Sequence, residues 1–281
     1  SVSAVMINSA RNKEKAAKEQ EAIAKTEAVH RFRESQSTIA ELSQLADALR
    51  DYPLAQAERQ QLLKAVTDYY DRQTSKQSDV PELRIEQLRS LVRLGEVFNQ
   101  LAEYAKAIKT WDRSTELAGN LEDDDTFGKE AAILHSQSLA GRTQSLLATG
   151  DHAAARTANE DAITRLAEIA DDTDLQIDLA VLRLQQASIE KVEGRYTAAL
   201  PLVDQAIESF QKLVESSSSD RARQQLGVSL GLRTQIQELT GNYTDAALSA
   251  NRAVNQWKEL TVEHPETVRY ADGLATSQID A

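Results

Sequence analysis

Histidines and carboxylates are the side chains of this 281-residue chain that could bind metal or transfer protons, so their spacing is considered first. The histidines lie far apart in the sequence and form no H-x-x-x-H pair: His30, His135, His152 and His264. Two acidic runs, 123–125 and 171–174, could indicate calcium-binding loops. A calcium loop counted from Asp123 or Asp172 would put Leu134 or Arg183 where a bidentate glutamate is needed. We therefore expect no bound metal and no cofactor.

Catalytic motifs are the next feature to test. A protein kinase needs a glycine-rich loop, a strand lysine, HRD and DFG, and the sequence contains none of these as a set. It also lacks the G-x-x-x-x-G-K-[ST] phosphate loop. The absence of cysteine removes thiol catalysis, thiolate metal sites and disulfides together. We expect no enzymatic activity from this chain.

The charge of the chain is uneven. Residues 1–50 hold eight basic and seven acidic residues, net +1, and the remainder holds 24 basic and 37 acidic, net −13, which together give −12. An acidic surface repels phosphate backbones, so nucleic acid is not an expected partner.

A repeated segment organises the rest of the chain. LGEVFNQLAEYAKAIKTW at 94–111 shares a frame with TGDHAAA at 149–155, EGRYTAA at 193–199 and TGNYTDA at 240–246. The aligned aromatic position steps by 48, 44 and 47 residues: Tyr104, His152, Tyr196 and Tyr243. Two positions earlier stand Ala102, Gly150, Gly194 and Gly241, and three positions later stand Ala107, Ala155, Ala199 and Ala246. Small residues follow seven positions further on: Ser114, Ala162, Ala206 and Ala253. The frame is an internal repeat, which points to a stacked array.

This pattern predicts pairs of antiparallel helices. Glycine adopts the left-handed conformation that ends the first helix. We expect the aromatic residue to fill the wedge between the two helices and the small residues to let the helix axes approach. The acidic runs and the stretch 216–220 are expected to cap helix N-termini.

The predicted organisation is all-α. We expect an N-terminal stalk helix at 1–36, as part of a long helix over 10–50, and then a solenoid over 37–281. Within the solenoid, a divergent helix pair at 37–76 precedes four repeats and a terminal helix. The repeats are placed at about 83–119, 126–170, 173–215 and 219–263, and the terminal helix at 265–280.

The first repeat resembles the tetratricopeptide repeat. Leu94-Gly95, Phe98, Tyr104, Ala107 and Trp111 stand where that motif has its L-G pair, aromatic, tyrosine, alanine and second aromatic. The resemblance implies a right-handed α-α superhelix, a tetratricopeptide-like solenoid. Later copies depart from the motif, with Thr143, Ala187 and Thr234 at the Gly95 position.

A narrower resemblance covers IAELSQL at 39–45, AERQQLLKAVTDYYDRQ at 57–73 and DVPELRIEQLRSLVRLGEVFNQLAEYAKAI at 79–108. It is similar to the region after the membrane helix of planctomycete-type Ser/Thr protein kinases. The resemblance implies a non-catalytic module of a membrane-anchored kinase, with a membrane helix before Ser1 and the solenoid outside the cytoplasm. SVSAVMIN at 1–8 would then be the end of that helix, or else a disordered terminus. The alternative is a stand-alone scaffold, cytoplasmic, that forms a weak homodimer through its N-terminal helix.

The tetratricopeptide resemblance also implies a partner surface. In such arrays the first helix of each pair lines a concave face that binds a peptide or protein. Carrying the groove-facing positions over copy by copy gives Arg89, Glu96, Asn99, Gln137, Gln144, Ser188, Lys191, Gln235 and Glu238. We expect a weakly held protein or peptide partner there, with Asn99, Gln144 and Gln235 nearest the centre. The alternative is that these are ordinary exposed helix positions.

Overall fold

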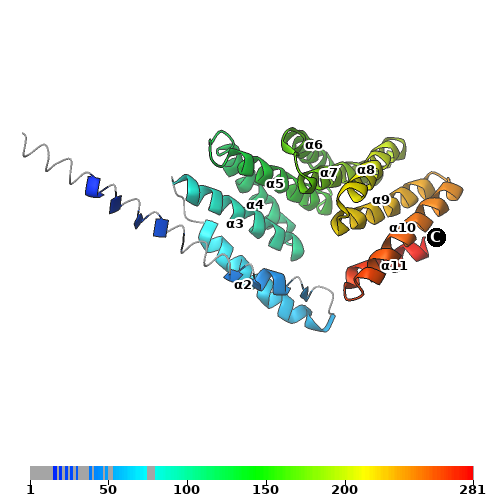
Figure 1. Cartoon of the computed structure of the whole chain (residues 1–281), viewed down its shortest axis with the longest axis horizontal. Helices are drawn as coiled ribbons and strands as arrows, with labels where there is room; N and C mark the ends of the chain where they lie inside the picture. Colours follow the sequence, from blue (N-terminus) through cyan, green and yellow to red (C-terminus); the bar gives the residue numbers. More distant parts are fainter. Residues whose placement is uncertain are drawn as a thin grey trace, which may run out of the picture. The chain divides into compact units, whose positions relative to one another are not determined.

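The computed structural model describes residues 53–74 and 80–280 and, nearer the N-terminus, positions 15–17, 19, 20, 23, 24, 26, 27, 30, 38, 39, 41–46, 48 and 49. The helices, labelled as in Figure 1, are η1 (Pro53–Ala55), α2 (Gln56–Thr74), α3 (Pro81–Gln100), α4 (Tyr104–Gly119), α5 (Gly128–Ala148), α6 (His152–Ile169), α7 (Thr173–Val192), α8 (Tyr196–Ser217), α9 (Asp220–Leu239), α10 (Tyr243–Glu263) and α11 (Val268–Ile279). The predicted stretch 1–8, and most of the long helix predicted over 10–50, lie outside the described residues.

The chain divides into two compact units, Ser1–Glu86 and Gln87–Ala281. In the first unit, α2 buries Leu63, Val66 and Tyr70 along one face. The guanidinium of Arg59 donates to the backbone oxygen of Ala46 at 3.2 Å, so α2 is tied to the helical residues that precede it. The second unit is a succession of helix pairs and carries the repeated segment.

The turn between paired helices has the backbone conformation that the glycine pattern predicted. Gly150, Gly194 and Gly241 have φ values of 83°, 75° and 78°. Ala102 occupies the same turn of the first pair and also has a positive φ, 56°. A Cβ is strained in this region, so the first turn keeps the geometry at a conformational cost that the glycine turns avoid.

The small residues predicted at the helix seams are buried. Ala107, Ala155 and Ala199 are fully inaccessible and Ala246 is 3% exposed. The second small position is likewise buried in every copy: Ser114, Ala162, Ala206 and Ala253. The prediction that the aromatic fills the wedge is wrong for the fourth copy, where Tyr243 is 71% exposed. Tyr243 is the first residue of α10, and Ala246, one turn later, occupies the seam instead.

Two tryptophans are each clamped between glycines of neighbouring helices. A Cβ on Gly95 of α3 or on Gly141 of α5 would lie 2.6 Å or 2.4 Å from the Trp111 ring of α4. In the same way, a Cβ on Gly227 of α9 or Gly273 of α11 would lie 2.7 Å or 2.6 Å from the Trp257 ring of α10. The glycine in the L-G pair of the first copy is therefore explained by close packing on an indole, since close-packed seams admit no extra carbon.

A buried serine recurs at one position of the first helices. Ser90, Ser138 and Ser229 stand five residues before the Gly95 position of their copies and are inaccessible, and only the third copy has another residue there, Leu182. Ser277 of α11 follows Ser229 after 48 residues and is also buried. By this register α11 corresponds to the first helix of a further repeat, although its Ile279 is 85% exposed.

Among the residues that the structure describes, none of the helices is both long and apolar enough to cross a membrane.

Candidate functional site

The first helices of successive pairs form one layer of the second unit. α7 contacts α9, and α9 contacts α11, in addition to the contacts of each with its own second helix. Over the continuously described stretch 80–280, no comparable contact joins α6 to α8 or α8 to α10. In Figure 1, α6 and α8 lie along the upper edge and α5, α7 and α9 lie below them. The first helices α7, α9 and α11 thus also contact one another in succession.

At the start of this layer, charged side chains pair with each other. Arg89 of α3 donates from Nε and Nη2 to the two carboxylate oxygens of Glu130 in α5, at 2.6 and 2.7 Å. This bidentate pair fixes orientation as well as distance. Glu96 accepts from Arg93, one turn earlier on the same helix, at 3.0 Å.

Asn99 is used inside the protein. Its Nδ2 donates to the backbone oxygen of Gly141 at 3.2 Å, and its Oδ1 accepts from the hydroxyl of Ser145 at 2.6 Å. Gly141 and Ser145 both belong to α5, so the amide of Asn99 joins the first helices of two successive pairs. The predicted role of Asn99 in contacting a partner stays a prediction. The sequence did not predict its structural role, because that role depends on a residue 46 positions away.

Lys191 and Gln235 make the corresponding link between α7 and α9. The ammonium of Lys191 donates to the amide oxygen of Gln235 at 2.7 Å. Burial lowers the pKa of Lys191, because the charged ammonium loses part of its hydration. Ser188, one turn before Lys191, bonds to the backbone oxygen of Leu184 in its own helix. The structure thus brings Lys191 and Gln235 together, as two adjacent members of the predicted groove.

The remaining predicted residues, Gln137, Gln144 and Glu238, are exposed. Sequence reasoning missed the aliphatic side chains beside them. Val192, Val228 and Leu239 are 56%, 42% and 55% exposed, and Val181 is half-buried. Val181, Ser188 and Val192 share one face of α7 by their spacing of seven and four residues, and Val228, Gln235 and Leu239 share the equivalent face of α9. That spacing was the available signal.

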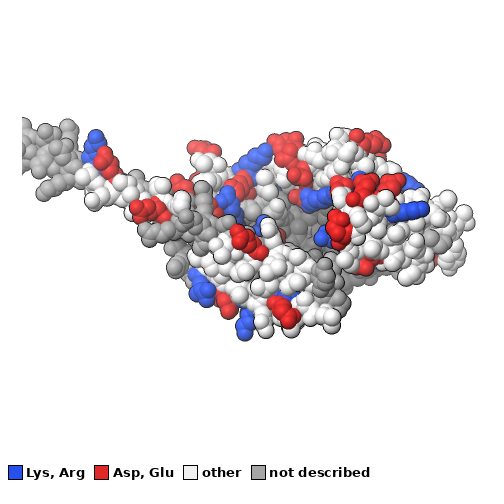
Figure 2. All heavy atoms as spheres, turned by 60° about the horizontal axis from the view of Figure 1, so that its bottom comes forward, with Lys and Arg blue, Asp and Glu red and all other residues white. Residues whose placement is uncertain are grey.

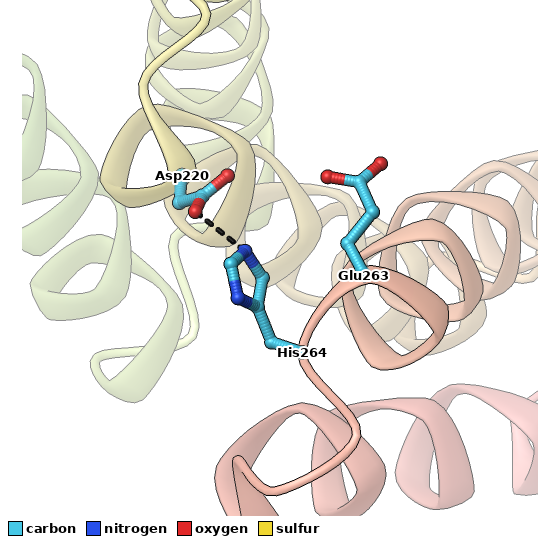
Figure 3. Close-up of side chains that lie close together, drawn as sticks. All are labelled: Asp220, Glu263 and His264. Atoms are coloured by element: carbon cyan, nitrogen blue, oxygen red, sulfur yellow. Dashed lines mark ion pairs between the residues drawn. The ribbon is translucent and has the colours of Figure 1, made fainter.

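A second cluster lies where α9 begins and α10 ends. Figure 3 shows Asp220, Glu263 and His264 converging there, and one ligand atom from each lies within 4.8 Å of the others. Carboxylate oxygens and an imidazole nitrogen are a ligand set that zinc accepts. However, an arginine already pairs with the two carboxylates of this cluster. Arg223 donates to Glu263 at 2.5 and 2.9 Å and to Asp220 at 3.2 Å, with its side chain only 13% exposed.

Arg223 accounts for the electrostatics of this cluster. Its hydrogen bond lowers the pKa of Glu263, and the pKa of Arg223 is raised mainly by the same bond. His264 Nε2 lies 2.7 Å from Asp220 Oδ2. The imidazole packs edge-on against the Tyr270 ring, with 5.9 Å between the ring centroids. A metal ion would have to displace Arg223 from two carboxylates. The arrangement joins α9, α10 and α11 as an ion-pair cluster, which the sequence spacing of the histidines did not reveal.

Two further polar networks join the second and third pairs to their neighbours. His135 Nδ1 lies 2.5 Å from Glu122 Oε1, and Arg165 Nη1 donates to both oxygens of Glu122 at 2.9 Å. Glu190, whose side chain is 8% exposed, accepts from Arg195 at 2.5 Å and pairs with Arg156 at 3.3 Å. A buried carboxylate needs such partners. Both networks tie neighbouring helices together.

Charges of both signs are interspersed on the face seen in Figure 2, where acidic and basic side chains lie close to one another. Ion pairs join neighbouring elements of the second unit: Lys129 with Asp171, Asp112 with Arg142, and Asp204 with Arg233. Each exposed pair contributes about 0–1 kcal/mol.

No protein-family model matches this chain, and no curated protein matches it. Solved structures share its fold. BtubC (BKLC) from P. vanneervenii aligns over 78% of this chain and 88% of its own, with 14% identity and a TM-score of 0.54.

Two other similar structures are tetratricopeptide proteins by description. A signal transduction ATPase with numerous domains and a tetratricopeptide repeat sensor, from Pyrococcus horikoshii, aligns over 89% of this chain and 33% of its own, with 14% identity and a TM-score of 0.56. A putative kinesin light chain with nearly identical tetratricopeptide-like repeats, from Podosopora anserina, aligns over 80% of this chain and 97% of its own, with 13% identity and a TM-score of 0.51. The predicted fold class, an all-α tetratricopeptide-like solenoid, is confirmed.

Proposed function

We propose that this chain is a non-catalytic interaction module that binds a protein or peptide partner on the inner layer formed by its first helices. The observation that carries the proposal is a row of exposed and half-buried side chains on that layer, with glutamines in α5, aliphatic groups and Ser188 in α7, and aliphatic groups with Gln235 in α9. Amides hydrogen-bond a partner's backbone, and each such bond contributes about 0.5–1.5 kcal/mol net. Arg89 and Asn99 join α3 to α5, and Gln144 and Gln235 face the partner.

The other polar clusters also support a non-catalytic role. His135, Glu190 and His264 each have a charged or polar partner within the protein, so none is left as an unsatisfied acid or base in a cleft. The fold similarity to solved tetratricopeptide structures supports an interaction scaffold as well. Neither line of support concerns the identity of the partner.

The experiment uses the absence of cysteine. Single-cysteine variants Gln144→Cys and Gln235→Cys carry a photo-crosslinking label on the inner layer, and Glu168→Cys and Arg252→Cys carry it at exposed positions on second helices. We expect the two inner positions to crosslink a common protein from a native lysate and the two control positions not to do so. Crosslinking that is equal at all four positions, or confined to the controls, would contradict the proposal.

The resemblance of residues 39–108 to the region after the membrane helix of planctomycete-type Ser/Thr protein kinases motivates a more specific proposal. We propose that the module belongs to a membrane-anchored Ser/Thr protein kinase, lies outside the cytoplasm and signals partner binding to the kinase. The alternative, a stand-alone scaffold that self-associates through its N-terminal helix, makes an opposite genetic prediction. The reading frame upstream of Ser1 should encode a kinase domain followed by about 20 apolar residues. A start codon close to Met6 would refute the kinase attachment.

A further inference from the structure

The partner surface is not uniform along the array, and its second half points to a chemical class of partner. At the two positions six residues before and one residue after the Gly95 position, which are exposed or half-buried, α3 has Arg89 and Glu96 and α5 has Gln137 and Gln144. The same positions carry Val181 and Ser188 in α7, and Val228 and Gln235 in α9. One turn beyond them lie Val192 and Leu239, each more than half exposed. An aliphatic side chain left in water on two neighbouring helices gains from a partner that covers it, by about 25 cal/mol per Å² of buried area.

A lysine stands beside these aliphatic groups. Lys191 is half-buried beside Val192, and its ammonium donates to a neutral amide, Gln235, at 2.7 Å. Within the described part of the chain no carboxylate lies at ion-pair distance from it, whereas other lysines of the second unit, such as Lys106, Lys129 and Lys212, each have one. A carboxylate brought by a partner would stabilise the partly desolvated ammonium and raise its lowered pKa again.

We propose that the α7/α9 face, defined by Val181, Ser188, Lys191, Val192, Val228, Gln235 and Leu239, binds an extended segment of a partner protein in which an aspartate or glutamate side chain lies between two aliphatic side chains. The carboxylate pairs with Lys191, and the aliphatic groups cover Val192 and Leu239. This inference rests on the proposed function and narrows it to one partner class.

The test begins with a library of random nonapeptides displayed without a free C-terminus, so that a terminal carboxylate cannot supply the acid. Selection on the wild-type chain is expected to enrich peptides with an acidic residue between two aliphatic ones. The enriched consensus is then synthesised with an amidated C-terminus, alongside a version with its acidic residue changed to the amide. Lys191→Met, which keeps the aliphatic stem and removes the charge, should weaken binding of the acidic peptide about tenfold and leave binding of the amide peptide within twofold.

A control lysine and two aliphatic substitutions distinguish the acidic partner class from the more general proposal of inner-layer binding. Lys258→Met, at an exposed lysine of α10, should change neither affinity, and Val192→Ser with Leu239→Ser should weaken both peptides. An enriched peptide that is sensitive to Val192→Ser but indifferent to Lys191→Met would overturn the acidic partner class and leave the inner-layer proposal standing. Peptides indifferent to all three inner-layer substitutions, or a selection that enriches nothing, would overturn both.

Discussion

The two halves of the first-helix layer use the same positions for different purposes. Between α3 and α5, Arg89 is locked to Glu130, Asn99 bridges to Gly141 and Ser145, and the Trp111 ring is held between two glycines. Between α7 and α9, Lys191 reaches Gln235 and Arg221 pairs with Asp178, and aliphatic side chains remain in solvent. The difference teaches that repeat position alone does not define a binding residue. Asn99 is bonded at both its nitrogen and its oxygen within the array, whereas Gln235 is bonded there through its oxygen and keeps its NH2 donors.

The largest effect that would sharpen this comparison is expected at the tryptophan of the first half. Trp111→Ala leaves a cavity bordered by Gly95 and Gly141, which carry no side chains to fill it, and should lower the free energy of unfolding by about 3–5 kcal/mol. Urea unfolding followed by circular dichroism measures the loss. Trp257 remains as the sole tryptophan and reports on the last pair. A loss under about 1 kcal/mol would show that the seam is not tightly packed.

The next effect concerns the amide bridge. Asn99→Ala leaves the Ser145 hydroxyl and the Gly141 carbonyl with fewer partners and should destabilise the chain by about 1–3 kcal/mol. The matched control, Gln144→Ala, changes an exposed amide on the same layer and should stay within about 0.5 kcal/mol of wild type. Equal effects of the two substitutions in thermal and urea unfolding would break the distinction between array-holding and partner-facing amides.

A smaller effect is expected at the turns. Ala102→Gly removes a Cβ from the left-handed region and should stabilise the chain by about 1 kcal/mol, whereas Gly150→Ala should destabilise it by a similar amount. Differential scanning calorimetry of both variants checks the prediction. Shifts of the same sign would mean that the first turn is not built like the second.

The smallest effect is expected at the ion-pair cluster of the second half and depends on pH. Arg223 lowers the pKa of Glu263 below its ordinary value near 4.5, so the pair stabilises the fold above that pH and loses its contribution as pH falls through the folded-state pKa. Glu263→Gln should therefore lower the melting temperature slightly at pH 7. The difference from wild type should shrink as pH falls below about 4.5 and vanish once pH is below the folded-state pKa of Glu263. A difference that persists unchanged in acid would remove Arg223 as its cause.

Much of the fold could be predicted because it depends on local chemistry that recurs. Glycine two residues before an aromatic and alanine three residues after it predict the turn and the seam in one frame, and both are present at Gly194 and Ala199. Ala102 shows the limit of that logic, since its turn forms without glycine. Tyr243 shows another limit, because an aromatic at the first residue of a helix can face solvent when a smaller side chain fills the seam.

The site was less predictable because it depends on contacts between copies. The motif placed Asn99 and Lys191 at the same position of their copies, yet only the structure shows that Asn99 is bonded by residues 42 and 46 positions away. The cluster of Asp220, Glu263 and His264 unites residues more than 40 positions apart through a helix pair. The exposed valines recur at helical spacing, so the sequence alone could have predicted them as members of this face.

The most direct test of this account is the affinity of one selected acidic peptide for two variants, Asn99→Ala and Lys191→Met, measured by fluorescence anisotropy at a temperature where both are folded. If Lys191 meets the partner as proposed and Asn99 holds the array, Asn99→Ala should bind within twofold of wild type and Lys191→Met about tenfold more weakly. If Asn99→Ala loses the peptide and Lys191→Met keeps it, the division of the layer into a holding half and a binding half is wrong.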